Sequence, residues 1–273
     1  MSAPPARGRA RHRRRDGAFA FALGALLLAL FIGVPMFALL FDVRPDAWLR
    51  ALGSEQARRA LGLTLVTTAI ATTACVALGL PLAYLLARFE FRGKAALDVL
   101  VDLPVTIPPV VVGLALLLAF GRQGLIGRHL DAFGIHVAFS TAAVVMAQVA
   151  MAAPFFVRAA RAGFEAVDER LEHAAWSLGA SRLHAFRTVV VPLARPALLA
   201  GAVMAWARAL SEFGATMMFA GNLPGRTQTL SLAVMSTMET DLETAVAVSA
   251  LSLALGVVAL VAMRVIVRRM GAV

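Results

Sequence analysis

The chain has 273 residues, of which 60% are hydrophobic and only 15% are charged, and its mean hydropathy is +0.80. A soluble domain of this length carries roughly 25% charged residues, so the composition excludes an ordinary soluble protein and indicates lipid as the solvent. The single cysteine, Cys75, excludes an internal disulfide.

Apolar runs recur along the chain at about the length that crosses a bilayer, roughly 20 residues. The first run is longer than the core of a signal peptide, which has about 7–15 residues, and only a weak cleavage site follows it, so we interpret it as a retained span. Six runs predict an all-α integral membrane protein with six transmembrane helices: Ala18–Phe41, Leu61–Ala87, Val99–Phe120, Val137–Val157, Ala197–Ala220 and Thr244–Met263.

The net charge of +10 is distributed unevenly among the connections between these runs. The amino-terminal arm, the second-to-third and fourth-to-fifth connections and the tail carry 18 of the 26 Lys and Arg residues. This bias follows the positive-inside rule and predicts that both termini are cytoplasmic. Topology therefore explains the charge without nucleic-acid binding. We divide the chain into a basic cytoplasmic arm (1–17), a six-helix transmembrane region (18–267) and a cytoplasmic tail (268–273).

The third run opens with three prolines, in "DLPVTIPPVVVGLALLLAF". Pro104, Pro108 and Pro109 each remove a backbone hydrogen-bond donor and so interrupt the helix. Such interruptions are tolerated in membranes where neighbouring helices satisfy the freed carbonyls. We therefore expect this run to be a moving or pore-lining element.

A polar segment, 158–196, separates the fourth and fifth runs and is predicted to face the cytoplasm. Hydrophobic residues recur in it at spacings of three and four, which predicts a short helix from about Val167 to Leu178. We expect Gly179 to end this helix and Pro192 to break the chain before the fifth span. A helix lying in the lipid headgroup layer is the alternative. Because the apolar stripe is thin and acidic residues flank it, docking of a soluble partner fits better.

The stretch "HAAWSLGASRLHAFRTVVVP" resembles the EAA loop of ABC importer permeases, in which an acidic-Ala-Ala triplet precedes a glycine and, thirteen residues later, a proline. Here a histidine takes the place of the acid, and the preceding glutamate substitutes for it only in part. The resemblance implies the type I importer permease fold, with this loop coupling the permease to its ATPase. The residues implied in coupling are Glu172, His173, Ala174, Ala175, Gly179 and Pro192.

The same resemblance implies two copies of the permease on a pair of cytoplasmic ATPase subunits, whose closure moves the docked helices as rigid bodies and switches the pore. The chain has no G-x-x-x-x-G-K-[ST] phosphate loop. We therefore expect a transport subunit that is not an enzyme, without cofactor or metal, with ATP and Mg²⁺ bound by the partner.

The end of the fifth run and the residues after it, "ARALSEFGATMMFAGNLPGRTQTL", resemble the molybdate, tungstate and sulfate branch of these importers, and so does the opening of the third run. Within the branch, "GNLPGRTQTL" is most similar to the molybdate permeases. The resemblance implies molybdate import across the bacterial inner membrane, with an oxyanion-binding protein as the outer partner. Sulfate and tungstate remain alternatives.

Arg208 and Glu212 are the charges deep in the fifth run, where an unpaired charge is costly. Four residues apart on one helical face, they either neutralise each other or take part in the pathway. A carboxylate does not favour an oxyanion, so we expect Glu212 to hold a gate or pair with Arg208. Phe213 and Gly214 supply the bulk and close approach of a hydrophobic constriction. With Thr216 and the three prolines, these residues form the predicted pathway.

After the fifth run, 221–225 contains the turn residues Gly, Asn and Pro. The apolar stretch Leu230–Met238 that follows is too short to cross the membrane, so it predicts a half-inserted or interfacial helix on the outer side.

A membrane-embedded enzyme is the first alternative to a transport subunit, but the five histidines lie in loops or the arm without the spacing of metal ligands. A non-transporting membrane scaffold would explain six spans but not the glycine-to-proline pattern of the loop.

Overall fold

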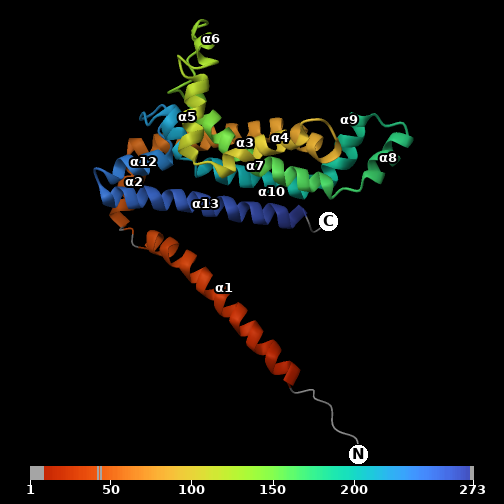
Figure 1. Ribbon diagram of the computed structural model, residues 1–273. Coiled ribbons are helices and arrows are strands. Elements are labelled where there is room, and N and C mark those ends of the chain that lie inside the picture. The colour runs from red at the N-terminus through yellow and green to blue at the C-terminus, as the bar shows by residue number, and fades with distance from the viewer. Residues whose placement is uncertain (1–8, 42, 44, 271–273) are drawn as a thin grey trace, which may run out of the picture.

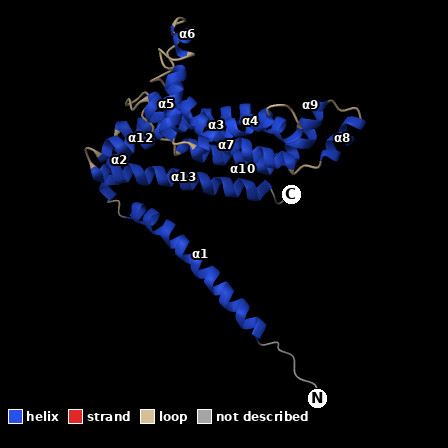
Figure 2. Cartoon of the chain, viewed as in Figure 1, coloured by secondary structure: helices blue, strands red, loops and turns tan. Residues whose placement is uncertain are grey.

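The computed structural model describes residues 9–41, 43 and 45–270, so parts of the predicted arm and tail lie outside the described residues. Every regular element in this part of the chain is a helix (Figure 2). The helices are α1 Arg9–Phe41, α2 Pro45–Gly53, α3 Glu55–Arg88, α4 Lys94–Thr106, α5 Pro109–Phe120, α6 Gly127–Asp131, α7 Thr141–Glu165, α8 Glu169–Ser177, α9 Arg182–Ala185, a π-helical segment Phe186–Val190, α10 Val191–Leu210, α11 Gly214–Ala220, α12 Leu230–Met238 and α13 Leu242–Met270.

Helix α7 lies at the centre of the bundle and packs against α3 on one side and α10 on the other. Small residues allow this close approach: a Cβ added to Gly79 would meet the ring of Phe156 at 2.7 Å, and one added to Gly163 would meet Ala197 at 2.5 Å. Packing through small residues is typical of membrane helices, because lipid offers no hydrophobic force to drive helices together.

Helix α1 extends away from the other helices (Figure 1). Its apolar part, Phe21–Phe41, is 0% buried within the chain, and Phe21 and Phe31 are almost fully exposed. A continuous apolar surface of this size is not stable in water. It therefore requires lipid or another protein chain around it.

The prediction of an all-helical membrane protein is confirmed. Within the part of the chain that the structure describes, four helices are long and apolar enough to cross a bilayer, and the count is five if the bent pair α4–α5 is one span. The sixth candidate lies within α13, whose stretch Leu242–Val258 is apolar but shorter. The count of six spans and the cytoplasmic placement of both termini stay predictions.

The third predicted span is not one continuous helix. The chain bends by 118° between α4 and α5, with Ile107 and Pro108 between the two helices. Pro109 is the first residue of α5, where its missing N–H costs no helical hydrogen bond. Pro108 and Pro109 thus interrupt the helix as predicted. The prediction for Pro104 is wrong, because this residue lies inside α4 and the helix continues past it.

Two further boundaries differ from the prediction. The fifth span, predicted to end at Ala220, stops at Leu210, and three residues separate it from α11. The fourth helix begins at Thr141 and runs to Glu165, eight residues beyond the predicted end. Ser140 caps its start, because its hydroxyl accepts a hydrogen bond from the Ala143 N–H at 3.3 Å.

The expected break at Pro192 is wrong, because the chain from Arg182 to Leu210 runs on as one helical stretch. Proline normally clashes with the carbonyl four residues earlier. Here a π-helical segment precedes Pro192, and the Val191 N–H bonds to the Phe186 carbonyl, five residues back. The wider π turn accommodates the proline ring without ending the helix.

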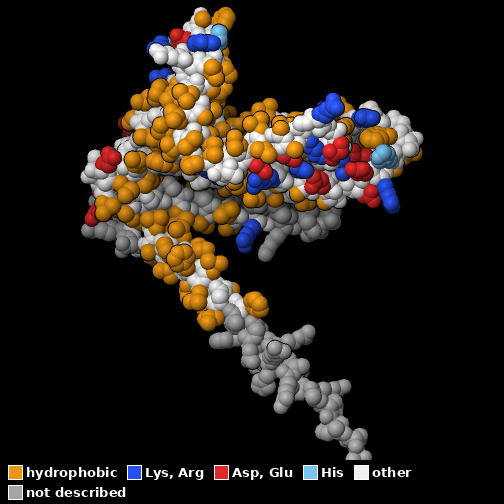
Figure 3. All heavy atoms as spheres, viewed as in Figure 1, with side chains coloured by type: hydrophobic (Ala, Val, Ile, Leu, Met, Phe, Trp, Pro, Cys, Tyr) orange, Lys and Arg blue, Asp and Glu red, His pale blue; other side chains and the backbone are white. Residues whose placement is uncertain are grey.

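Charged side chains gather at the end of the bundle that carries α8 and α9, whereas hydrophobic side chains cover α5 and α1 on the visible face (Figure 3). Ion pairs join helices at this polar end: Arg158 contacts Asp102 at 2.7 Å, and Arg161 contacts Asp98 at 2.6 Å. These pairs fasten α4 to α7. The helices α2 and α12 lie at the opposite end (Figure 1).

Candidate functional site

Helix α8 is bounded by local signals at both ends. At its start, the Asp168 carboxylate accepts a hydrogen bond from the Arg170 N–H at 2.9 Å. At its end, Gly179 has a φ of +89° and bonds to the Trp176 carbonyl, while the Ala180 N–H bonds to the Ala175 carbonyl. This pair of bonds is a Schellman cap, whose left-handed residue is usually glycine. The predicted helix and its glycine stop are thus present, within two residues at each end.

One face of α8 points away from the bundle. His173 and Ala174 are exposed, Ala175 is half-buried, and the side chain of Leu178 just after the helix is 89% exposed. This face therefore presents small side chains and one large apolar side chain to the outside. Pro192, predicted to belong to the same site, is exposed in the first turn of α10 and separated from α8 by α9 and the π-helical segment.

Glu172 points the opposite way, into the bundle, unlike the neighbouring His173. Its side chain is 4% exposed. The Tyr84 hydroxyl donates to Glu172 Oε2 at 2.7 Å, and Arg88 Nε donates to Oε1 at 2.8 Å. The carboxylate is therefore buried but fully engaged by two donors on α3, as a buried charge requires.

Arg88 holds the turn before α8 at further points. Its Nη2 donates to the Val167 carbonyl at 2.7 Å, and its Nη1 lies 3.4 Å from Glu169 Oε1. The sequence interpretation missed both Arg88 and Tyr84. A signal was available: Tyr84 is the single tyrosine of the chain and lies one turn before an arginine at the end of an apolar run.

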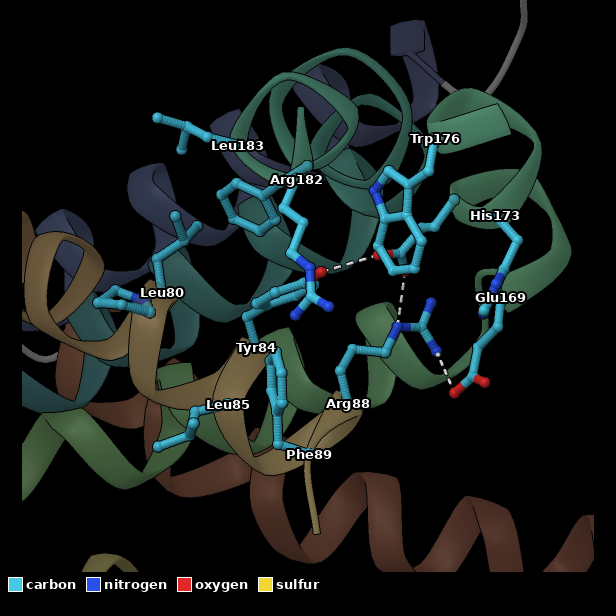
Figure 4. A pocket seen from close by; sticks show the side chains of 13 residues that line it. Leu80, Tyr84, Leu85, Arg88, Phe89, Glu169, His173, Trp176, Arg182 and Leu183 are labelled. Atoms are coloured by element: carbon cyan, nitrogen blue, oxygen red, sulfur yellow. Dashed lines mark hydrogen bonds and ion pairs between the residues drawn. The ribbon is translucent and has the colours of Figure 1, made fainter. Parts of the chain in front are cut away.

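A cavity of about 430 Å³ lies between α3, α8 and α9 (Figure 4). Its walls are largely apolar, formed by residues such as Leu80, Leu85 and Leu183. Trp176 closes it on the side of α8, with the Arg182 guanidinium 5.4 Å from its ring centre. This cation–π contact links α8 to α9 across the glycine turn.

The predicted pathway residues lie where α5 meets α11. A Cβ added to Gly214 would meet Pro109 and Val110 at 3.1 Å, and one added to Gly113 would meet the Ala215 carbonyl at 2.6 Å. The two helices thus pack backbone to backbone just after the bend and just after the break. Pro108 is exposed at the bend itself, and Pro104 lies within α4, one turn earlier.

An ion pair and a hydrogen bond of one carboxylate stabilise the connection between α10 and α11. Arg208 Nη2 lies 2.7 Å from Glu212 Oε2, and the other oxygen of Glu212 accepts the Ala215 N–H at 2.7 Å. The two charges are thus paired with each other, and a role of these residues in the pathway stays a prediction. Phe213 is partly exposed, whereas the Thr216 hydroxyl is buried without a hydrogen-bond partner among the described residues.

No group of three or more His, Cys, Asp or Glu side chains that could hold a metal ion occurs among the described residues. The polar contacts described in both regions are ion pairs, hydrogen bonds and helix caps within the chain.

Comparison with known proteins finds relatives that match most of the chain. The chain is 41% identical over 229 residues to the molybdenum transport system permease protein ModB of Mycobacterium bovis, covering 84% of this chain and 87% of that protein. It is 44% identical over 183 residues to ModB of Escherichia coli K12, covering 67% and 80%. It is also 33% identical over 265 residues to the sulfate transport system permease protein CysT of Salmonella typhimurium, covering 95% and 96%.

Among solved structures, a bacterial ABC transporter that imports the acidic polysaccharide alginate has the same fold. It matches with a TM-score of 0.78 at 17% identity, covering 94% of this chain and 96% of that one. A second structure of an alginate transporter, in complex with its periplasmic protein, matches with a TM-score of 0.76 at 17% identity, covering 97% and 98%.

The family described as "Binding-protein-dependent transport system inner membrane component" matches residues 79–272, which include both the α8 region and the α5–α11 contact. The chain therefore belongs to this family, and it is a multi-pass transport subunit of the bacterial inner membrane.

Proposed function

We propose that this chain is the permease subunit that carries molybdate in an ATP-driven importer. The observation that supports it most is the identity of 41% with a molybdenum permease over 84% of the chain. The similarity to the sulfate permease is lower, at 33%, although it covers 95% of the chain. Sulfate is therefore the second candidate, with tungstate beside it.

In this proposal, α8 docks on the ATPase subunit. Its exposed face presents His173 and Ala174, with Leu178 as an apolar anchor beyond the last turn. Small alanines let a partner approach closely, and the Schellman cap at Gly179 fixes the direction in which the chain leaves. ATP and Mg²⁺ bind to that partner, which supplies the energy for transport.

The assembly contains two copies of this chain, two ATPase subunits and an outer oxyanion-binding protein. The exposed apolar surface of α1 supports a second copy, because a helix that makes few contacts within its own chain can pack against another. One structural relative is a transporter in complex with its periplasmic protein. The basic arm (1–17) and the tail (268–273) lie on the cytoplasmic side of this assembly.

The pathway lies along the bend between α4 and α5 and the break between α10 and α11. Both sites interrupt a helix within an apolar region, where irregular backbone is tolerated if it lines a cavity. In this proposal Phe213, which is partly exposed, narrows the path. The Thr216 hydroxyl, buried without a hydrogen-bond partner among the described residues, bonds to a passing oxyanion once the contact opens.

Uptake of labelled molybdate at trace concentration, by cells with and without this chain, tests the proposal. We expect uptake to require the chain and to resist excess sulfate. If cells without the chain keep molybdate uptake but lose sulfate uptake, the substrate is sulfate and not molybdate. No change in either ion would contradict transport of oxyanions by this protein.

A further inference from the structure

The contact between α3 and α8 consists largely of one polar cluster. The backbone of α8 packs mainly against α9 and the π-helical segment, both of which follow it in the chain. The cavity of about 430 Å³ separates the Trp176 end of α8 from the wall of α3 (Figure 4). At the other end of α8, Tyr84 and Arg88 reach across from α3 and bond to Glu172.

The geometry of this cluster resists movement in more than one direction. Arg88 contacts three points around the start of α8, at Val167, Glu169 and Glu172, and its side chain is 8% exposed. Hydrogen bonds to ionised groups are shorter and stronger than neutral ones, and several from one planar guanidinium fix orientation as well as distance. A push or pull on α8 is therefore transmitted to Arg88.

Arg88 and Tyr84 are themselves firmly held. Arg88 is the last residue of the 34-residue helix α3, and Tyr84 lies one turn before it on the same side. The Tyr84 ring contacts Phe164 of α7 at 5.6 Å and Phe186 of the π-helical segment at 4.6 Å between ring centres. The cluster thus lies where the membrane helices α3 and α7 meet the stretch that leads into α10.

We infer that Tyr84, Arg88 and Glu172 form a joint that transmits the motion of α8 to the membrane helix α3, and that they are positioning residues for transport. The inference rests on the proposed docking of α8 but assigns a different role to a different face. The outward face of α8 binds the ATPase, whereas the inward carboxylate converts that binding into movement of α3. Glu172 therefore acts within the chain and not as a contact to the ATPase.

The experiment uses the complete complex of permease, ATPase and binding protein in liposomes, and measures molybdate transported per ATP hydrolysed. Glu172→Gln removes the charge at nearly constant shape, and we expect the transport-to-hydrolysis ratio to fall about tenfold, the size of a moderate coupling free energy. Glu90→Gln is the matched control. It makes the same change on a side chain that is 88% exposed and pairs with Lys94 near the end of α3.

Tyr84→Phe is the milder variant, because it removes a single hydroxyl and leaves the ring packing intact. It keeps the inference testable if Glu172→Gln does not assemble. We expect a smaller fall in the ratio, and a combined Tyr84→Phe and Glu172→Gln variant no worse than Glu172→Gln alone, since both act on one network. Arg88→Lys, which keeps the charge but not the fork, should retain part of the coupling.

Two results together would overturn the inference. The Tyr84→Phe complex would have the transport-to-hydrolysis ratio and the melting temperature of the wild type, and the assembled Glu172→Gln complex would have the same ratio as the control. A loss of transport and hydrolysis together, in proportion to a lower melting temperature, would do the same, because it indicates a structural role alone. Failure of the wild-type chain to bind the ATPase would instead contradict the proposed docking, and failure to carry molybdate would contradict the proposed substrate.

Discussion

Arg208 and Glu212 form a 2.7 Å ion pair across the end of a helix, since α10 stops at Leu210, between them. The pair keeps the four-residue spacing of a helix even though Glu212 already caps the next helix through Ala215. A single carboxylate thus joins the end of α10 to the start of α11. The ion pair and the cap therefore stabilise the three-residue connection between α10 and α11.

Substituting Glu212 should loosen this junction. Glu212→Ala removes both the ion pair and the cap from a side chain that is 1% exposed, and we expect a loss of about 2–4 kcal/mol of unfolding free energy. Glu212→Gln keeps a side-chain oxygen that can accept the Ala215 N–H, so we expect a smaller loss of unfolding free energy. The melting temperature of the detergent-solubilised protein measures both, with Glu55→Gln, in an exposed pair with Arg59, as control. Equal melting temperatures for Glu212→Ala and the control would contradict this account.

The contact between α5 and α11 should not tolerate a methyl group. Gly113→Ala places a Cβ 2.6 Å from the Ala215 carbonyl oxygen, so one helix must move, at a cost of about 1–3 kcal/mol. We expect lower transport together with a lower melting temperature. Gly62→Ala is the control, because an added Cβ there has open space around it. A Gly113→Ala variant that matches Gly62→Ala in both measurements would show that the contact is not required.

The glycine at the end of α8 should matter for docking through its backbone conformation alone. Gly179→Ala meets no neighbouring atom, but at a φ of +89° a Cβ costs about 1–2 kcal/mol. We expect up to about a tenfold loss in affinity for the ATPase subunit, since about 1.4 kcal/mol corresponds to a factor of ten.

Gly93→Ala provides the control for Gly179→Ala, because Gly93 has a φ of +94°, also in open space, but lies before α4. It should lower stability by a similar amount while leaving the affinity for the ATPase unchanged. Binding of the purified ATPase to each variant gives the comparison. An equal loss of affinity in both would mean that the strain acts on the whole chain and not on the exit from α8.

The exposed face of α8 should reject a bulky charge. Ala174→Arg places a long side chain where the proposed ATPase surface approaches the helix, and we expect the ATPase no longer to co-purify. His173→Glu, which restores the acidic residue typical of the loop, should keep or strengthen the association. Ala95→Arg, on an exposed position of the first turn of α4, is the control. Normal co-purification of the Ala174→Arg protein would place the docking surface elsewhere.

Local signals explain why much of the α8 region could be predicted from sequence. The cap at Asp168, the helical spacing of apolar residues and the glycine at 179 all act within a few positions of one another. The prediction that Pro192 breaks the chain is wrong, because it assumed a regular α-helix before the proline. A proline ends a regular α-helix, but the π-helical hydrogen bond from Val191 to Phe186 removes the clash, and nothing in the residue pattern marks that change.

The sequence alone determined that this chain is a helical membrane protein. It also determined that a polar loop contains a short helix that ends at a glycine. Both follow because hydropathy and helical periodicity are properties of neighbouring residues. Only the tertiary structure decided that the chain bends by 118° between α4 and α5 and that Glu172 turns inward to Arg88, 84 residues away. Such pairings depend on how separate helices pack. A buried carboxylate and an exposed one look alike in a sequence until the partner that compensates the charge is placed beside it.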